Sequence, residues 1–344
     1  MSADKLPAPT RIALIGSGTI GLSFAALHLT QSPDAQVTIY DTRPDLEKYI
    51  EDNLPGIHTL HPSPYATTQL TTPLPHSPGY LSTLSPTHTL PTLLTTSRLS
   101  ISPSLPTAVS TADIIQEQSP ETPHIKQSLW ATIESHAPPH ALFWSSTSGI
   151  PASTISANMA DKSRLLVVHP YNPPHIMPLL ELVPGPTTPT PLVDRTMAYW
   201  QALGRKPVVI RKETTGFVAN RLAYALLREA VHLVREGVVG VKELDEIVEN
   251  SMGPRWAVAG PFKSYHMGGG EGGLRGFFEK IGGTVQGCWG DAGVVNVGEG
   301  GWEGGLFEEV ERVYGPSRGL SVRTRDERTK GVLEARGEGV QPGK

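Results

Sequence analysis

The order of apolar and polar residues predicts alternating strands and helices over the first two thirds of the chain. Five short apolar runs have the length of buried strands: residues 11–15, 36–41, 112–117, 141–146 and 164–170. Apolar positions recur at helical spacing between them, above all at residues 19–30 and 123–136. Because strands that alternate with helices form parallel sheets, we expect an α/β domain with a doubly wound sheet.

The pattern of the last third is that of helices alone. The segment Gly216–Glu236 carries apolar residues at helical spacing, and a second helical pattern follows at residues 241–253. From Gly268 the chain is rich in glycine, and we expect loops there. The sequence thus divides into three parts: an α/β domain over residues 9–213, a smaller all-α domain over residues 214–316, and a polar, frayed tail over residues 317–344.

Residues 55–110 interrupt the α/β pattern. They hold ten of the chain's 32 prolines, and Arg98 is the one formally charged residue from Asn53 to Ala112. Because proline lacks a backbone donor and clashes with the preceding helical turn, we expect irregular structure here. Four histidines of this segment lack the fixed spacing of metal ligands, so we expect no metal site: His58, His61, His76 and His88.

The strongest motif is a turn of the form G-x-G-x-x-G between the first strand and the first helix. We expect five residues of this turn to bind the pyrophosphate of a dinucleotide: Gly16, Gly18, Thr19, Ile20 and Gly21. Asp41 ends the second strand, where a carboxylate binds the adenosine ribose hydroxyls and repels a 2′-phosphate. The motif therefore predicts a Rossmann-type domain that binds NAD rather than NADP, with the nearby Arg43 as a mild counter-argument.

Composition excludes several classes of protein. The chain has 344 residues, a formal net charge of −4 and a pI near 6.3, which argue against a nucleic-acid partner bound through phosphates. Its single cysteine, Cys288, allows no disulfide within the chain and fits a reducing compartment. No apolar run approaches the roughly 18 residues that cross a bilayer, and the first residues lack the apolar stretch of a signal peptide. We therefore expect a soluble cytoplasmic protein.

His169 lies at the carboxyl end of a predicted strand, which is where open parallel sheets bind their ligands. A histidine in this position is either a core residue bonded to the backbone or a base that meets a substrate. Glu181, in a downstream apolar run, is a candidate partner for the imidazole, and Ser148 offers a hydroxyl on a neighbouring strand end. Because a nicotinamide enzyme that oxidises an alcohol needs a base and hydrogen bonds to the oxygen, we favour the second interpretation.

Several segments resemble the 3-hydroxyacyl-CoA dehydrogenase family. The family's catalytic histidine and its glutamate partner are matched within HPYNPPHIMPLLELV, which implies His169 as the general base and Glu181 as its partner. The family's serine lies 21 residues before this histidine, which implies Ser148. The start of the family's C-terminal domain, whose asparagine completes the site, is similar to GFVANR and implies Asn220.

A further match, QSPETPHIKQ, implies that Glu121 and Lys126 lie near the nicotinamide ribose. Within the family, the motifs most resemble the lambda-crystallin and L-gulonate 3-dehydrogenase branch, through HPYNPPH, PLLELVP and PLVDRT. The resemblance implies a homodimer that oxidises the 3-hydroxyl of a free 3-hydroxy acid to the 3-keto acid with NAD. Three alternatives stay open: a 3-hydroxyacyl-CoA dehydrogenase acting on a CoA thioester, a non-catalytic crystallin-like NAD-binding protein, and an oxidoreductase with Lys126 as its base.

Overall fold

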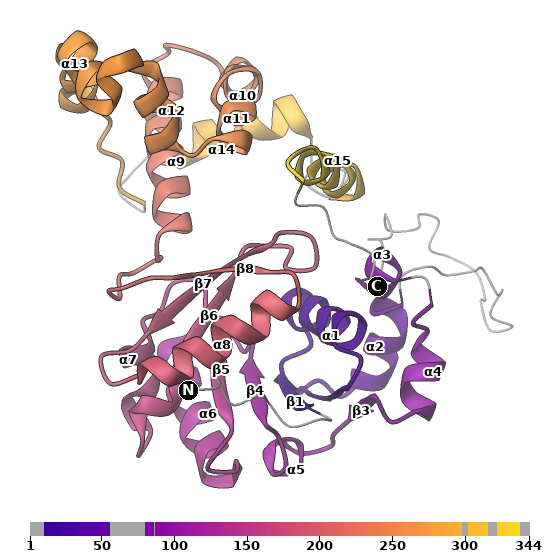
Figure 1. Cartoon of the computed structure of the whole chain (residues 1–344). Helices are drawn as coiled ribbons and strands as arrows, with labels where there is room; N and C mark the ends of the chain where they lie inside the picture. Colours follow the sequence, from indigo (N-terminus) through magenta and orange to yellow (C-terminus); the bar gives the residue numbers. More distant parts are fainter. Residues whose placement is uncertain (1–9, 56–79, 86, 298–301, 316–321, 338–344) are drawn as a thin grey trace, which may run out of the picture. The chain divides into compact units, whose positions relative to one another are not determined.

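The structure is a computed structural model that describes residues 10–55, 80–85, 87–297, 302–315 and 322–337. The chain divides into two compact units, and the border lies between Asn220 and Arg221, a few residues beyond the expected one. The first unit contains a sheet covered by helices, and the second contains helices alone (Figure 1). The predicted fold class, a doubly wound α/β domain followed by an all-α domain, is confirmed.

The first unit is built on one eight-stranded sheet with the order β3-β2-β1-β4-β5-β6-β7-β8 (Figure 1). Its strands are β1 (Thr10–Ile15), β2 (Ala35–Tyr40), β3 (Leu99–Ile101), β4 (Ile114–Glu117), β5 (Leu142–Ser145), β6 (Leu165–Pro170), β7 (Leu179–Pro184) and β8 (Lys206–Val209). The first six strands run parallel, β7 pairs antiparallel with β6, and β8 runs parallel to β7. The order of β1 to β6 is that of dinucleotide-binding sheets, which bind their ligand where the order reverses, between β1 and β4.

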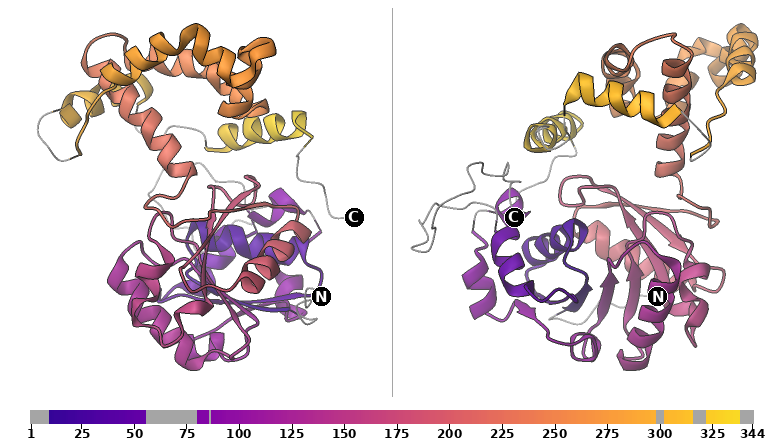
Figure 2. Two further views of the ribbon diagram at one scale, coloured as in Figure 1. Left: turned by 60° about the vertical axis from the view of Figure 1, so that its left-hand side comes forward. Right: turned by 180° about the vertical axis from the view of Figure 1, so that it is seen from behind.

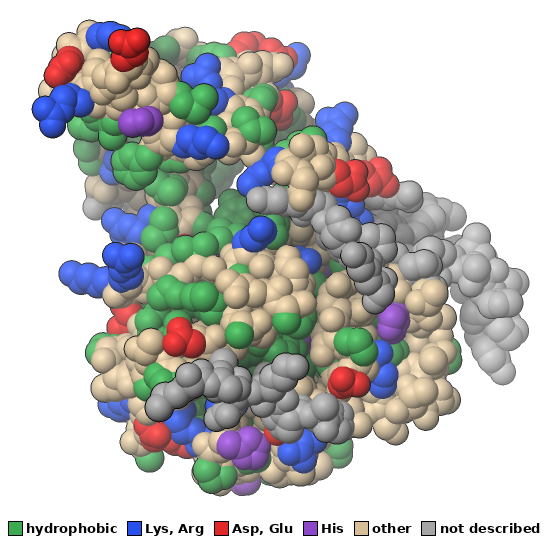
Figure 3. Space-filling view, viewed as in Figure 1, with side chains coloured by type: hydrophobic (Ala, Val, Ile, Leu, Met, Phe, Trp, Pro, Cys, Tyr) green, Lys and Arg blue, Asp and Glu red, His purple; other side chains and the backbone are tan. Residues whose placement is uncertain are grey.

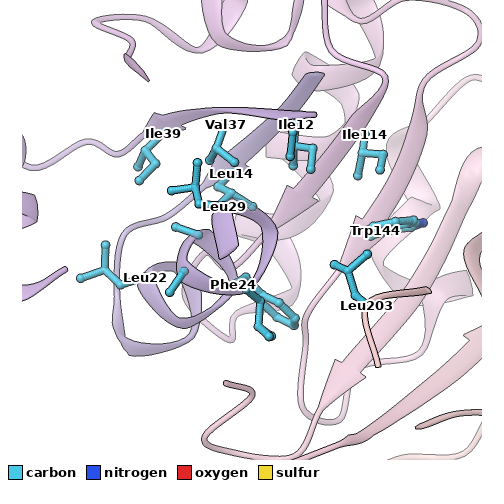
Figure 4. Packing of buried hydrophobic residues seen from close by; sticks show 14 of the residues in the cluster. Ile12, Leu14, Leu22, Phe24, Leu29, Val37, Ile39, Ile114, Trp144 and Leu203 are labelled. Atoms are coloured by element: carbon cyan, nitrogen blue, oxygen red, sulfur yellow. The ribbon is translucent and has the colours of Figure 1, made fainter. Parts of the chain in front are cut away.

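Helices cover both faces of this sheet (Figure 1). They are α1 (Thr19–Gln31), α2 (Leu46–Asn53), α3 (Tyr80–Leu84), α4 (Leu90–Thr95), α5 (Leu105–Val109), α6 (Pro123–His136), α7 (Ala152–Ile155) and α8 (Thr190–Ala202), with 3-10 turns at Ser156–Asn158 and Lys162–Arg164. Because side chains alternate between the faces of a strand, Leu14 and Ile15 enter different cores. Leu14 joins Phe24 and Trp144 in the core beneath α1 (Figure 4), whereas Ile15 joins Trp130 of α6.

The described part of the proline-rich segment, from Tyr80 onward, differs from the irregular structure that we expected. It contains α3, α4, the edge strand β3 and α5. Pro91 and Pro106 occupy the first turns of α4 and α5, where a missing backbone N–H breaks no helical hydrogen bond. Thr89 and Ser104 cap these helices by accepting a hydrogen bond from a first-turn N–H, at 3.4 and 3.3 Å. Prolines and hydroxyl residues therefore begin short helices here.

His88 is the one histidine of the proline-rich segment that lies within the described residues. His58, His61 and His76 lie outside the described ranges, and the Nδ1 atom of His88 lies 2.8 Å from Ser85 Oγ. Across the part of the chain that the structure describes, no three histidine, cysteine or acidic side chains are grouped to hold a metal ion. None of the helices in those same ranges is long and apolar enough to cross a membrane.

The second unit is all helical in its described residues (Figure 2). Its helices are α9 (Ala219–Arg235), α10 (Val241–Asn250), α11 (Met252–Val258), α12 (Pro261–Gly268), α13 (Gly273–Asp291), α14 (Trp302–Tyr314) and α15 (Val322–Ala335), with a 3-10 turn at Gly270–Gly272. The first two residues of α9 belong to the first unit. The long helix that we expected from the apolar pattern after Gly216 corresponds to α9.

Helices also run through two stretches where we expected loops or a frayed end. α13 crosses the glycine-rich stretch, and α15 lies in the polar tail. A Cβ atom added to Gly276 would lie 3.1 Å from Gly269 O, and one added to Gly269 would lie 1.7 Å from Gly273 O. Glycine therefore permits the close approach of α12 and α13, and its frequency does not signal loops here.

Candidate active site

Contacts that only glycine permits close the turn between β1 and α1. Gly16 has a φ angle of 108°, and its N–H donates to Tyr40 O of β2 at 2.8 Å. A Cβ atom added to Gly21 would lie 2.0 Å from Gly16 O, whereas one added to Gly18 meets no atom within 4 Å. The first and third glycines of the motif thus build the turn, and the second leaves open space at the start of α1, as the approach of a pyrophosphate requires.

We expect the variants Gly18→Val and Gly21→Ala to fail in different ways. A Cβ atom at Gly18 meets open space, so valine should be tolerated in the folded protein but should fill the space of the pyrophosphate. NADH affinity should then fall roughly 100-fold or more through lost phosphate hydrogen bonds. The alanine methyl overlaps a backbone carbonyl, so Gly21→Ala should lower Tm instead. Fluorescence titration with NADH and thermal denaturation measure the two effects. An equal loss of Tm in both variants would contradict this division of roles.

Asp41 lies beside the glycine turn at the carboxyl end of β2. Its Oδ2 atom accepts hydrogen bonds from the N–H and the hydroxyl of Ser17, both at 2.7 Å, and its Oδ1 atom accepts from the N–H of Arg43 at 3.1 Å. Burial acts to raise the pKa of Asp41, but these hydrogen bonds outweigh it and hold that pKa below its usual value. Thr19 and Ile20 begin α1, where backbone N–H groups lack helical partners. The negative charge of Asp41 and the backbone N–H groups at the start of α1 therefore lie beside the glycine turn.

His169 and Glu181 form a buried pair across β6 and β7. The antiparallel register places them opposite each other, and His169 Nδ1 lies 2.8 Å from Glu181 Oε2. Burial acts to raise the pKa of Glu181, but the hydrogen bonds from His169 and from the N–H groups of Ala219 and Val218 outweigh it and lower that pKa. Since a charged carboxylate only accepts, the imidazole carries its proton on Nδ1, and Nε2 is the atom available as a base.

The other oxygen of Glu181 fixes the start of α9. Glu181 Oε1 accepts hydrogen bonds from the N–H groups of Val218 at 2.9 Å and Ala219 at 3.0 Å. Phe217 precedes them with a φ angle of 51°, and its buried ring lies 5.2 Å from the His169 ring between centroids. We did not single out Phe217 from the sequence, although the Gly-Phe pair before the helix was the available signal.

A second cluster joins Glu121, Ser148 and Asn220 beyond the ends of β4 and β5. Glu121 Oε1 accepts from the N–H of Ser148 at 2.8 Å, from its hydroxyl at 3.2 Å and from the N–H of Gly149 at 3.2 Å; the hydroxyl of Thr147 donates to the same oxygen. Asn220 Nδ2 donates to Ser148 O at 2.8 Å. The structure thus brings these three predicted site residues together. They lie next to the N–H groups of Val218 and Ala219, which bind the carboxylate of Glu181.

Lys126 lies behind this second cluster. Its side chain is 1% exposed, its Nζ atom donates to Glu117 Oε1 at 2.6 Å and to Ser119 O at 3.1 Å, and Glu121 Oε2 lies 3.4 Å away. An ammonium group with three protein oxygens around it has its three donors directed within the protein. The geometry therefore makes Lys126 a support for Glu121 and disfavours it as a base that meets a substrate. Its expected contact with the nicotinamide ribose stays a prediction.

Glu117 is the centre of the support behind Lys126, and we did not single it out from the sequence. The residue is fully buried. Besides Lys126, its carboxylate accepts from the N–H of Ser119 at 2.6 Å, from Trp130 Nε1 at 3.2 Å and from the Ser145 hydroxyl at 2.6 Å. A buried charge needs such a set of partners. The signal in the sequence was an acidic residue directly at the end of an apolar strand.

Two family models match the chain. The model described as 3-hydroxyacyl-CoA dehydrogenase, NAD binding domain, matches residues 87–214, and the model described as 3-hydroxyacyl-CoA dehydrogenase, C-terminal domain, matches residues 216–294. Together they cover more than half of the chain. The border between the two matches falls in the turn that precedes α9.

Known proteins resemble the whole chain or its larger part. The L-carnitine dehydrogenase of Streptomyces coelicolor is 33% identical over 279 residues, which are 81% of this chain and 80% of that protein. The 3-hydroxyacyl-CoA dehydrogenase of Gibberella moniliformis is 40% identical over 184 residues, 52% of this chain and 56% of that protein. Among solved structures, an NAD⁺-dependent dismutase, 5-formyl-3-hydroxy-2-methylpyridine 4-carboxylic acid 5-dehydrogenase, is similar with a TM-score of 0.70 and 26% identity, over 95% of this chain and 97% of that one.

Proposed function

Because this chain belongs to the 3-hydroxyacyl-CoA dehydrogenase family, we propose that it oxidises the 3-hydroxyl group of a free 3-hydroxy acid, with His169 as general base. Membership of this family makes the chain an NAD-dependent dehydrogenase. The observation that carries the proposal is the buried His169–Glu181 pair, whose Nδ1 and Oε2 atoms are 2.8 Å apart at a strand end. A general base must be held in one orientation to take the hydroxyl proton.

Residues of the first unit fit NAD where the strand order reverses, between β1 and β4. Gly18 leaves room for the pyrophosphate, and the carboxylate of Asp41 is fixed beside the same turn for the adenosine ribose. Glu121 lies in the loop that follows β4, on the nicotinamide side in our proposal. When bound, NAD supplies the hydride acceptor for the reaction.

The chain's own groups handle the proton and the oxygen in the proposed reaction. His169 takes the 3-hydroxyl proton at Nε2, and Glu181 stabilises the imidazolium that forms through the Nδ1 hydrogen bond. Ser148 and Asn220 donate hydrogen bonds to the reacting oxygen. Asn220 is held close to Ser148 by its hydrogen bond to the Ser148 carbonyl oxygen, and the second hydrogen of its amide nitrogen remains for the substrate.

A free acid is the proposed substrate class, in preference to a CoA thioester. The motifs of the histidine segment imply an L-gulonate-like substrate, and L-carnitine, in the name of a relative, is likewise a free 3-hydroxy acid. The alternative of a 3-hydroxyacyl-CoA dehydrogenase has support from the Gibberella relative of that name. These two classes differ in the group attached to C1 and not in the chemistry at C3.

Absorbance at 340 nm with NAD tests the proposed function. A panel of L-gulonate, L-carnitine and 3-hydroxybutyrate is compared with 3-hydroxybutyryl-CoA, which matches the last acid in its acyl part. We expect the best free acid to have a higher kcat/KM than the thioester. A higher value for the thioester would support the acyl-CoA alternative. Binding of NADH without turnover of any compound would support the non-catalytic alternative.

We also propose that two chains pair through the second unit. Among the described residues of this unit, buried apolar side chains are few, and Figure 3 shows hydrophobic side chains on its surface. Large apolar side chains are exposed on several of its helices, including Leu222 of α9 at 60%, Phe262 of α12 at 78% and Met267 of α12 at 66%. Exposed apolar area of this kind marks an interface. Light scattering at micromolar concentration should give twice the monomer mass of 37.0 kDa, and a monomer mass would refute the proposal.

A further inference from the structure

Phe217 combines a left-handed backbone with a fully buried side chain at the turn before α9. Its φ angle is 51°, and the preceding Gly216 has a φ angle of 74°. Glycine adopts this region readily, but a Cβ atom crowds the following carbonyl group there, so a phenylalanine in this region is an outlier. Its ring is nonetheless part of the core cluster that also contains Trp130 and Val183. A residue stays in so unfavourable a conformation only where its surroundings hold it there.

Hydrogen bonds on both sides hold the turn around Phe217. Before it, the N–H of Gly216 donates to Gly149 O at 3.2 Å, and the N–H of Phe217 itself donates to Thr214 O at 3.1 Å. After it, two successive N–H groups donate to Glu181 Oε1, at 2.9 and 3.0 Å. The left-handed turn thus directs two neighbouring backbone donors to one carboxylate oxygen.

The ring of Phe217 packs on the imidazole of His169. The two ring centroids are 5.2 Å apart, and the ring planes are inclined by 51°. The hydrogen bond from Nδ1 to Glu181 holds one edge of the imidazole. A hydrogen bond tolerates bending by about 30°, so this bond alone leaves the imidazole plane free to tilt. Contact with a rigid, fully buried ring limits that tilt.

We infer that Phe217 is a positioning residue, which holds the imidazole of His169 in the plane from which Nε2 meets the substrate. The inference rests on the proposed function, because Phe217 acts only through the proposed base. This one residue supports both members of the pair: its ring limits the tilt of the imidazole, and its backbone presents the N–H groups that hold Glu181. Misplacement of a reacting group by about 1 Å can lower a rate roughly 100-fold, so the support has a measurable effect.

The variant Phe217→Leu tests the inference. Leucine keeps an apolar side chain in the core but presents no flat ring to the imidazole. We expect kcat on the best 3-hydroxy acid to fall roughly 10- to 100-fold, while KM for NAD and affinity for NADH stay near those of wild type. Rates are expressed per NADH-binding site, measured by fluorescence titration, so that unfolded protein does not enter the value. Phe217→Met should show the same loss, and it replaces the leucine variant if that one fails to fold.

The matched control is Phe143→Leu, the same substitution at a fully buried residue of the same core cluster. The Phe143 ring packs on Trp130, with the ring centroids 5.2 Å apart. The control should lower Tm and keep wild-type kcat, because it weakens core packing without touching the base. A Phe217→Leu variant whose kcat falls no more than that of the control would overturn the inference.

A double variant separates this inference from the proposed function. Because the base is already absent in His169→Gln, the addition of Phe217→Leu should change the residual kcat little. A further loss of roughly 10- to 100-fold in the double variant would show that Phe217 does not act through His169, and it would overturn the inference alone. Wild-type kcat in the single variant His169→Gln would instead refute the proposed function, and the inference with it.

Discussion

The variant His169→Gln is expected to lose roughly 10²- to 10⁴-fold in kcat on the best substrate, while its NADH affinity stays near that of wild type. Glutamine keeps the polarity of the side chain, but it cannot take the hydroxyl proton. The loss should fall on kcat because the proposed function assigns His169 to the reacting group, whereas the glycine turn and Asp41, the proposed cofactor contacts, lie elsewhere in the unit. Steady-state rates and NADH titration measure the two quantities.

A matched control for this variant is His136→Gln, because His136 is exposed at the end of α6. The control should keep wild-type kcat. Glu181→Gln should also lower kcat, because a neutral amide no longer balances the charge of the imidazolium that forms at His169. A His169→Gln variant with wild-type kcat would make His169 a structural residue.

The variant Lys126→Met should destabilise the first unit by about 3–5 kcal/mol, because it leaves the buried carboxylate of Glu117 without its counter-charge. At roughly 2–4 °C per kcal/mol for a unit of this size, Tm should fall by roughly 6–20 °C. Thermal denaturation measures this loss. The double variant Lys126→Met with Glu117→Gln should recover part of the lost stability, since it removes both charges of the pair.

The single and the double variant also distinguish a structural role of Lys126 from a role in cofactor binding. If Lys126 acts through Glu121, both the single and the double variant keep measurable NADH affinity, and the main effect is on Tm. A normal Tm together with a large rise in KM for NAD would show that Lys126 itself contacts the cofactor. That result would restore the role that the family resemblance implied.

Local patterns in the sequence predicted most of the first unit. The runs around Ile15 and Tyr40 are short, apolar and separated by the glycine motif, so β1, α1 and β2 agree with their predicted bounds within a residue or two. The bounds of α6 agree with the expected 123–136, because Pro123 marks its first turn. α13 was missed since glycine that serves close helix packing looks the same in a sequence as glycine in a loop.

The candidate site was predictable where residue type and position along a strand carried the information. His169 and Glu181 were paired from the sequence, and the structure places them in hydrogen-bond contact. β7 was not predicted as a strand. Its pairing with β6 is a tertiary contact, which the local spacing of apolar residues does not report. Glu117 and Phe217 were missed for a similar reason: their importance lies in buried three-dimensional neighbours, which apolar spacing does not report.

The antiparallel pairing of β6 with β7 limits which insertions and deletions the chain can tolerate. Side chains alternate between sheet faces, so a shift of β7 by one residue would turn Glu181 away from His169 and toward the core beneath α1. An insertion or deletion of one residue inside β7 is therefore incompatible with the buried pair.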